Sequence, residues 1–164
     1  MKDRFRIFLF LALLYAVLIF YLSSQSNPGD PRSFLEHLYS RELLDVLMSI
    51  ERSDLRFILY PLYLYSVYPD KVIHAILYSG FGFLLYLTLK NSPSRTLSSY
   101  AFLFAIIIGT VYGATDEFHQ SFVPRRTMSI DDLLADCIGL TIAQMIIFIT
   151  KTIIFIKDKL YFKR

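Results

Sequence analysis

The sequence predicts an all-α integral membrane protein, a bundle of four transmembrane helices, and three observations support this. Hydrophobic residues make up 55% of the 164 residues, and the mean hydropathy is +0.47, too apolar for a soluble domain of this size. Four apolar runs approach the length that crosses a bilayer core of roughly 30 Å. Basic residues flank the runs, as charges that orient membrane helices do. We expect one membrane domain over residues 1–164, with spans at about 5–22, 72–89, 100–115 and 132–150.

The first span, residues 5–22, follows a basic start that contains Lys2, Arg4 and Arg6. A basic start before an apolar run is also typical of a signal peptide. Residues 23–26, Ser-Ser-Gln-Ser, lack a good small-x-small cleavage pattern, so we expect an uncleaved helix.

Residues 23–70 are predicted to leave the membrane and to form short interfacial helices outside the cytoplasm. Pro28 and its polar neighbours break the first helix. Residues 34–50 mix apolar and charged side chains at helical spacing, which predicts an amphipathic helix at the interface. Residues 55–68 are apolar but short and contain Pro61, which favours an interfacial or re-entrant piece.

Two of the later spans carry patterns on one helix face. Steps of four residues place their members on a shared face. Around the start of the second span the residues on this face are polar: Asp70, His74 and Tyr78. In the third span they are small residues that allow close helix packing: Ala105, Gly109 and Gly113.

The distribution of basic residues predicts the orientation of the chain. Residues 1–6, the loop with Lys90 and Arg95, and a basic tail over 151–164 are expected on the cytoplasmic side. Both termini are then cytoplasmic, and the polar groups between the spans lie on the outer face. The net charge of +3 is modest and dispersed, so we expect membrane lipids as partners and no nucleic acid.

Polar groups beside membrane helices are candidates for function, because an ionised group near hydrocarbon costs several kcal/mol unless it is paired or hydrated. The stretch 113–139 holds most of them. Our candidate catalytic residues are His74, Asp116, Glu117 and His119. Our candidate binding residues are Gln25, Asp70, Lys71, Gln120, Arg125, Arg126, Asp132 and Asp136.

Four uses of these residues stay open. The charges could only neutralise one another and hold a loop. His74 and His119, with two of Asp116, Glu117, Asp132 and Asp136, could bind zinc or manganese, although no tight ligand spacing is present. A histidine beside a carboxylate could act as a general acid or base. The arginines could bind an anionic headgroup in a fork.

Two contacts are predicted for the connection between the third and fourth spans. Thr127 or Ser129 is predicted to cap the start of the fourth helix, and Ser129 stands three residues before Asp132, as in a capping box. The carboxylates at the two helix ends would repel one another, so a cation must lie among them or some of them must hold protons. We expect Arg126, in the linking turn, to pair with Glu117 or Asp132.

The chain resembles the VanZ-like family of small bacterial membrane proteins, named for a protein associated with teicoplanin resistance. Three motifs carry the resemblance: Ser-Ser-Gln-Ser at 23–26, Asp-Lys-Val-Ile-His at 70–74 with Tyr78, and Asp-Glu-x-His-Gln-x-Phe-x-Pro-x-Arg at 116–126, followed by Asp132 and Gly139. The third motif is the specific one. The family usually has glycine where this chain has Arg125, and often asparagine where it has Asp136.

The resemblance implies an outward-facing role in the cell envelope. Our first hypothesis is a module that binds a lipid-linked precursor or an anionic headgroup and lowers susceptibility to a glycopeptide such as teicoplanin. The second is a membrane hydrolase or transferase that acts on a lipid-linked or phosphorylated envelope substrate. The third is a structural scaffold, which is disfavoured because membrane helices can pack without this many charges.

Overall fold

A computed structural model describes residues 2–26, 49, 60–61, 63–65 and 67–161, and it confirms the all-α class. Four of its helices are long and apolar enough to cross a membrane, as the hydropathy predicts. The described helices are α1 (Lys2–Ser23), α5 (Pro69–Lys90), α6 (Arg95–Ser99), α7 (Ala101–Gln120) and α8 (Ile130–Tyr161).

Most of the expected interfacial segment lies outside the described residues, including nearly all of the predicted amphipathic helix at 34–50. In the piece expected at 55–68, residues 60–61, 63–65 and 67 are helical. A short helix after the first span is therefore consistent with the prediction.

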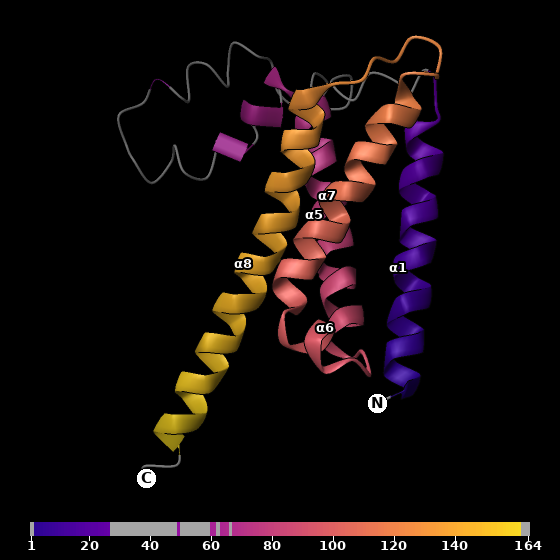
Figure 1. Ribbon diagram of the computed structural model, residues 1–164. Coiled ribbons are helices and arrows are strands. Elements are labelled where there is room, and N and C mark those ends of the chain that lie inside the picture. Colours follow the sequence, from indigo (N-terminus) through magenta and orange to yellow (C-terminus); the bar gives the residue numbers. More distant parts are fainter. Residues whose placement is uncertain (1, 27–48, 50–59, 62, 66, 162–164) are drawn as a thin grey trace.

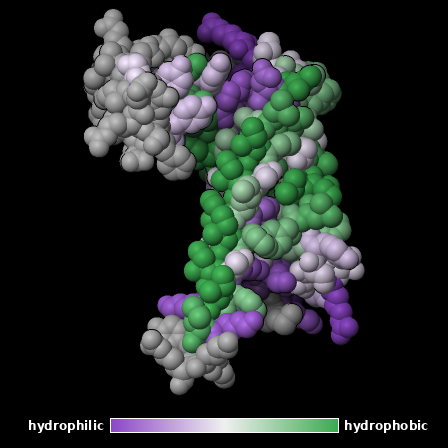
Figure 2. Space-filling view, turned by 90° about the vertical axis from the view of Figure 1, so that its left-hand side faces the viewer, coloured by the Kyte–Doolittle hydropathy of each residue, from purple (hydrophilic) through white to green (hydrophobic). Residues whose placement is uncertain are grey.

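The long helices stand side by side, and α5 contacts α1, α7 and α8 (Figure 1). The ends of the chain marked N and C lie at one end of the bundle, and the connection from α7 to α8 lies at the other (Figure 1). An apolar surface covers the middle of the molecule, with hydrophilic residues gathered toward both ends (Figure 2). This banding is expected of a protein whose waist contacts lipid.

Helix α8 is longer than the expected span and continues through the start of the predicted basic tail. Lys151 donates a hydrogen bond to the hydroxyl of Tyr86 on α5. Its amino group also lies 4.7 Å from the ring centre of Tyr86 and 5.6 Å from that of Phe102. The first lysine after the expected span therefore anchors α8 to α5 and α7.

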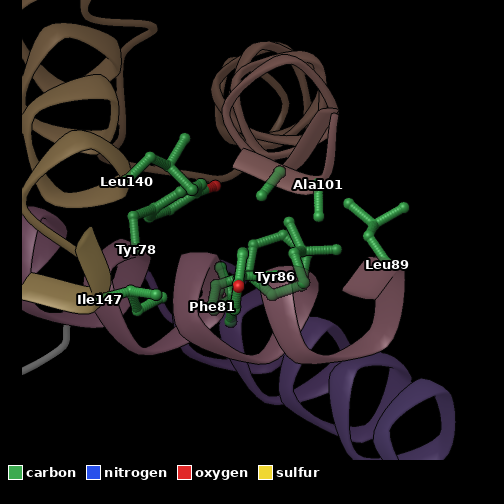
Figure 3. Close-up of a cluster of buried hydrophobic side chains, with 10 residues drawn as sticks. Tyr78, Phe81, Tyr86, Leu89, Ala101, Leu140 and Ile147 are labelled. Carbon is green, nitrogen blue, oxygen red and sulfur yellow. The ribbon is translucent and has the colours of Figure 1, made fainter. Parts of the chain in front are cut away.

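The apolar core lies where α5 meets α7 and α8 (Figure 3). Aromatic rings dominate it, and Phe81 contacts Tyr112 with ring centres 5.1 Å apart. Helix α1 joins this core through Tyr15, whose ring stacks on Phe81, and through a 2.6 Å hydrogen bond from the Tyr112 hydroxyl to the Ala16 carbonyl. This packing places the ends of α1, α5, α7 and α8 next to one another.

Small residues set how closely α8 approaches its neighbours. A β-carbon on Gly109 would overlap the side chain of Leu140, so the predicted small-residue stripe of α7 is confirmed as a packing surface for α8. A β-carbon on Gly139 would meet the backbone of Ala75 on α5, including its carbonyl oxygen. The α5–α8 crossing therefore requires glycine at this position.

Candidate functional site

The polar groups of four helices meet at the end of the bundle that carries the α7–α8 connection. A cavity of about 260 Å³ opens there. Its aliphatic wall comes from α1 and α5 and consists of Ile19, Leu22, Ile73 and Leu77. Its polar wall consists of Ser23, Gln25, Asp70, His74, Tyr78, Asp116, Gln120 and Arg126. The predicted face of Asp70, His74 and Tyr78 is confirmed, because all three residues line this cavity.

Asp116 is held in place by neighbours on both oxygens. Ser23 donates a hydrogen bond to Oδ1 at 2.6 Å, and the Gln120 side chain donates one to Oδ2 at 3.3 Å. Asp116 is 3% exposed. The carboxylate therefore ties the end of α1 to α7 and has both oxygens already engaged.

Glu117 caps the helix that follows it in the chain. Its Oε2 accepts a hydrogen bond of 2.8 Å from the backbone N–H of Ser129. The Ser129 hydroxyl in turn accepts one of 3.2 Å from the N–H of Asp132, which confirms the predicted cap. The acid that completes this capping arrangement comes from α7, twelve residues earlier, rather than from α8 itself.

Asp132 pairs with Lys71, which stands in the first turn of α5. The Lys71 side chain is 35% exposed and that of Asp132 is 13% exposed, so the pair lies at the rim of the bundle. It joins the start of α5 to the start of α8. The positive charge beside Asp132 therefore comes from Lys71, where we expected Arg126.

The prediction that Arg126 pairs with Glu117 or Asp132 is wrong. Arg126 lines the cavity, and its Nε donates to the backbone carbonyl of Gln25 at 3.4 Å. The linking turn carries Arg125 at φ 67°, in the left-handed region, and this conformation directs the next residue toward α1. A glycine would fit this φ without strain.

His74 and Asp136 form an ion pair between α5 and α8. His74 Nδ1 lies 2.9 Å from Asp136 Oδ1, the histidine side chain is 13% exposed, and the aspartate is completely buried. A carboxylate in this position orients the ring and fixes which nitrogen carries the proton. Asp136 Oδ2 and Glu117 Oε1 are buried and have no partner among the described residues.

The remaining candidates lie around these groups. His119 Nε2 is 3.1 Å from the hydroxyl of Ser24, and its ring centre is 4.4 Å from that of Phe20. His119 therefore attaches α7 to α1 and stands apart from the acids with which we expected it to bind a metal. Arg125 is exposed and does not line the cavity.

The candidate lists omitted three residues that build the site. Ser23 orders Asp116, and Ser129 links Glu117 to α8. Tyr78 lines the cavity, and its hydroxyl has no hydrogen-bond partner within the described part of the chain. Two of them carried a signal in the sequence, since Ser23 opens a motif and Tyr78 follows His74 by four residues. The link from Ser129 to Glu117 depends on how two helix ends meet, which no local spacing reveals.

A second hollow, of about 630 Å³, lies between α5 and α8. Apolar side chains such as Val72 and Ile138 form most of its lining, and Lys71 and Asp131 also lie at it. A lining that is mostly apolar suits an acyl chain better than a polar headgroup. The candidate site for recognition or chemistry is therefore the smaller cavity.

The comparisons with known proteins agree with this architecture. A family model described as VanZ/LLP1 matches residues 8–153, a range that includes all of α5 and α7, most of α1 and α8, and every residue of the cavity. No curated protein and no solved structure matched the chain. The chain belongs to the VanZ/LLP1 family of multi-pass membrane proteins.

Proposed function

We propose that the cavity binds the headgroup of an amphiphile of the cell envelope and that Arg126 holds an anionic group of that headgroup. The observation that carries this proposal is an arginine side chain at a cavity with an aliphatic wall. In the part of the chain that the structure describes, the Arg126 side chain contacts only the Gln25 carbonyl, through Nε. Its two terminal amino groups are then available to a phosphate or carboxylate, which guanidinium binds in a fork.

The acids of the cavity select the rest of the headgroup. Asp116 is already satisfied by Ser23 and Gln120, so it contributes negative charge without needing a new partner. Asp70 is exposed and faces the same space. A ligand with an anionic group near Arg126 and hydroxyl or ammonium donors near Asp70 satisfies both. Lipid phosphates with a sugar, glycerol or amine substituent have this chemistry.

The size of the cavity favours an amphiphile over a free metabolite. Sites that enclose a whole small molecule measure about 300 to 1,000 Å³, and this cavity holds about 260 Å³. It accommodates a headgroup but not acyl chains. The aliphatic wall of Ile19 and Leu22 on α1 and of Ile73 and Leu77 on α5 continues into the apolar surface, where the chains of a lipid would lie.

Lipid binding by two matched variants tests the proposal. Purified protein is incubated with phosphatidylglycerol or with phosphatidylcholine, and bound lipid is counted by native mass spectrometry. We expect Arg126→Gln to lose at least about tenfold in affinity for phosphatidylglycerol, the loss that removing one charge-assisted hydrogen bond gives. Arg125→Gly removes the same charge from the same turn and should keep the affinity. Equal losses in the two variants, or a loss in neither, would refute the role of Arg126.

Binding of an envelope precursor at the outer leaflet would also lower the access of a glycopeptide antibiotic. We therefore extend the proposal to teicoplanin susceptibility. Overexpression of the wild-type protein should reduce both susceptibility and surface binding of labelled teicoplanin, and overexpression of Arg126→Gln should not. Unchanged drug binding on overexpression would remove this extension and leave the lipid proposal intact.

A second candidate function is a membrane hydrolase or transferase, and the His74–Asp136 pair favours it. His74 lines the cavity, and a buried carboxylate orients its ring. This is the arrangement by which a histidine acts as a general base toward a bound substrate. Turnover of a lipid-linked substrate should then be lost in His74→Gln and kept in His119→Gln. If a panel of such substrates gives no turnover with wild-type protein, binding alone remains.

A further inference from the structure

We infer that His74, Glu117 and Asp136 form a binding site for a divalent transition-metal cation. The site goes beyond the proposed function and does not depend on what the cavity binds. The three side chains come from α5, α7 and α8, and each offers one ligand atom within 4.8 Å of the others. Three helices therefore bring one ring nitrogen and two carboxylate oxygens to a single point.

Two oxygens at this point lack the partner that a buried oxygen requires. Glu117 is 2% exposed, and Ser129 occupies Oε2 while Oε1 has no partner among the described residues. Asp136 is completely buried, and within the same part of the chain His74 occupies Oδ1 while Oδ2 is unpartnered.

The direction of the Asp136 oxygen supports the same site. A β-carbon built on Gly113 would lie 2.9 Å from Oδ2, so this oxygen faces α7. Glu117 follows Gly113 by four residues and therefore lies on the same face of α7, one turn further along. Oδ2 thus points at the helix face that carries the other unpartnered acid.

The nearby cations leave these two acids without enough positive charge. Lys71 is engaged by Asp132, and Arg126 contacts the Gln25 carbonyl across the cavity. Among the described residues, only His74 forms an ion pair with either acid. Two buried carboxylates this close repel each other strongly when both are ionised, and either a shared proton or a further positive charge relieves the repulsion. A dication supplies that charge and is ligated by both unpartnered oxygens, whereas one shared proton serves a single hydrogen bond.

The set of donors indicates the class of metal. One imidazole nitrogen with two carboxylate oxygens suits Zn²⁺ or Mn²⁺ better than Mg²⁺, which prefers oxygen ligands alone. Ligand atoms around tetrahedral zinc lie about 3.4 Å apart, given bonds of about 2.1 Å. The three ligand atoms of this site lie within 4.8 Å of one another. They must approach one another by at most about 1.4 Å to bind zinc, a distance that side-chain rotation can close. Three protein ligands leave one position open, on the side where His74 lines the cavity.

Titration with metal alone tests the site. Full-length protein in detergent is stripped with EDTA, dialysed, and titrated with Zn²⁺, Mn²⁺ or Mg²⁺ by isothermal calorimetry, and Co²⁺ reports the coordination by its absorption spectrum. We expect one high-affinity Zn²⁺ per chain, a weaker response to Mg²⁺, and a rise in the unfolding temperature when Zn²⁺ is added back.

Three variants locate the metal, and two of them preserve the local hydrogen bonds. Glu117→Gln keeps an acceptor for the Ser129 N–H, and His74→Gln keeps a polar partner for Asp136, so both remove a ligand with little structural change. The third variant is Asp136→Ala. Each of the three single variants should weaken Zn²⁺ binding by at least about 100-fold, because the loss of a residue that only supports a metal ligand already costs up to about 100-fold. Asp131→Asn, on an exposed acid of the same helix, and His119→Gln should bind as the wild type does.

Two results would overturn the site. One is a wild-type protein that binds no Zn²⁺, Mn²⁺ or Co²⁺. The other is metal binding that survives in Glu117→Gln and His74→Gln, which would place the ion elsewhere. Phosphatidylglycerol binding by the stripped protein separates the two proposals, because the Arg126 site should function without metal.

Discussion

A methyl group at Gly139 should separate α5 from α8 and pull the candidate site apart. The β-carbon of Gly139→Ala would lie 2.9 Å from both Cα and C of Ala75, and nearer still to its carbonyl oxygen. Ordinary contact begins at 3.4 Å and the carbonyl oxygen would lie at 2.1 Å, so the helices must part by about 1.3 Å. These neighbours are backbone atoms, so no side-chain rotation relieves the overlap.

The shift acts on the ion pair beside it. His74 adjoins Ala75, and Asp136 stands one helical turn before Gly139. A separation of about 1.3 Å lengthens the contact between His74 Nδ1 and Asp136 Oδ1 from 2.9 Å to as much as about 4.2 Å, beyond hydrogen-bond length. Overpacking costs about 1 to 3 kcal/mol, and alanine in place of helical glycine returns about 1 kcal/mol. The difference is a net loss of about 0 to 2 kcal/mol in the free energy of unfolding, and we expect the upper end of this range because the overlap is with backbone atoms.

Gly82→Ala is the matched control, because it lies in the same interface. Its β-carbon would meet Leu140 Cδ2 at 3.1 Å, Leu140 Cα at 3.3 Å and Ala143 Cβ at 3.4 Å, so the neighbours must give by only a few tenths of an ångström, far less than at Gly139. It gains the same helix propensity, so its stability should be unchanged or higher by up to about 1 kcal/mol. Reversible unfolding in mixed SDS micelles, followed by circular dichroism, measures both variants. Equal stability of Gly139→Ala and Gly82→Ala would refute the close α5–α8 crossing.

Three further changes test individual contacts, each by the same unfolding assay. Arg125→Gly should raise stability by about 0.5 to 1 kcal/mol, because glycine relieves the left-handed φ of 67° at some cost in chain entropy, and a loss would contradict this strain. Ser129→Ala should cost about 1 kcal/mol by removing the hydroxyl cap of α8, and no change would show that the cap is unimportant. Lys71→Met should cost about 1 to 2 kcal/mol by leaving Asp132 unpaired at 13% exposure, less than for a fully buried pair. Adding Asp132→Asn should recover most of that loss, and failure to recover it would exclude the pair as the cause.

The four long helices could be predicted from the sequence because hydropathy and length are local properties of the chain. The convergence of the polar groups followed from the same information, since successive spans cross the membrane in opposite directions and alternate connections therefore lie on one side. The cavity, which is lined by residues from the ends of α1, α5 and α7 and by Arg126 of the α7–α8 connection, agrees with that reasoning.

The partners of the charges could not be predicted, because spacing along a helix says nothing of which neighbouring helix it faces. Arg126 looked suited to the acids because it is close to them in sequence. The left-handed turn at Arg125 directs it toward α1 instead, and Lys71, which resembled an ordinary flanking charge, binds Asp132. Spacing also did not reveal that one oxygen of Glu117 caps α8 through Ser129. These contacts arise only when the helix ends pack.

Both candidate functions assume that the cavity opens at the outer face of the membrane, and cysteine accessibility in intact cells tests this assumption most directly. Cys137 is the only cysteine, so Cys137→Ala provides a clean background for single cysteines at Thr127, next to Arg126 in the α7–α8 connection, and at Ser94, the N-cap of α6 at the opposite end of the bundle (Figure 1). We expect a membrane-impermeant maleimide to label Thr127→Cys in intact cells and to label Ser94→Cys only after permeabilisation. The reverse pattern would place the cavity in the cytoplasm and contradict a role at the outer face of the envelope.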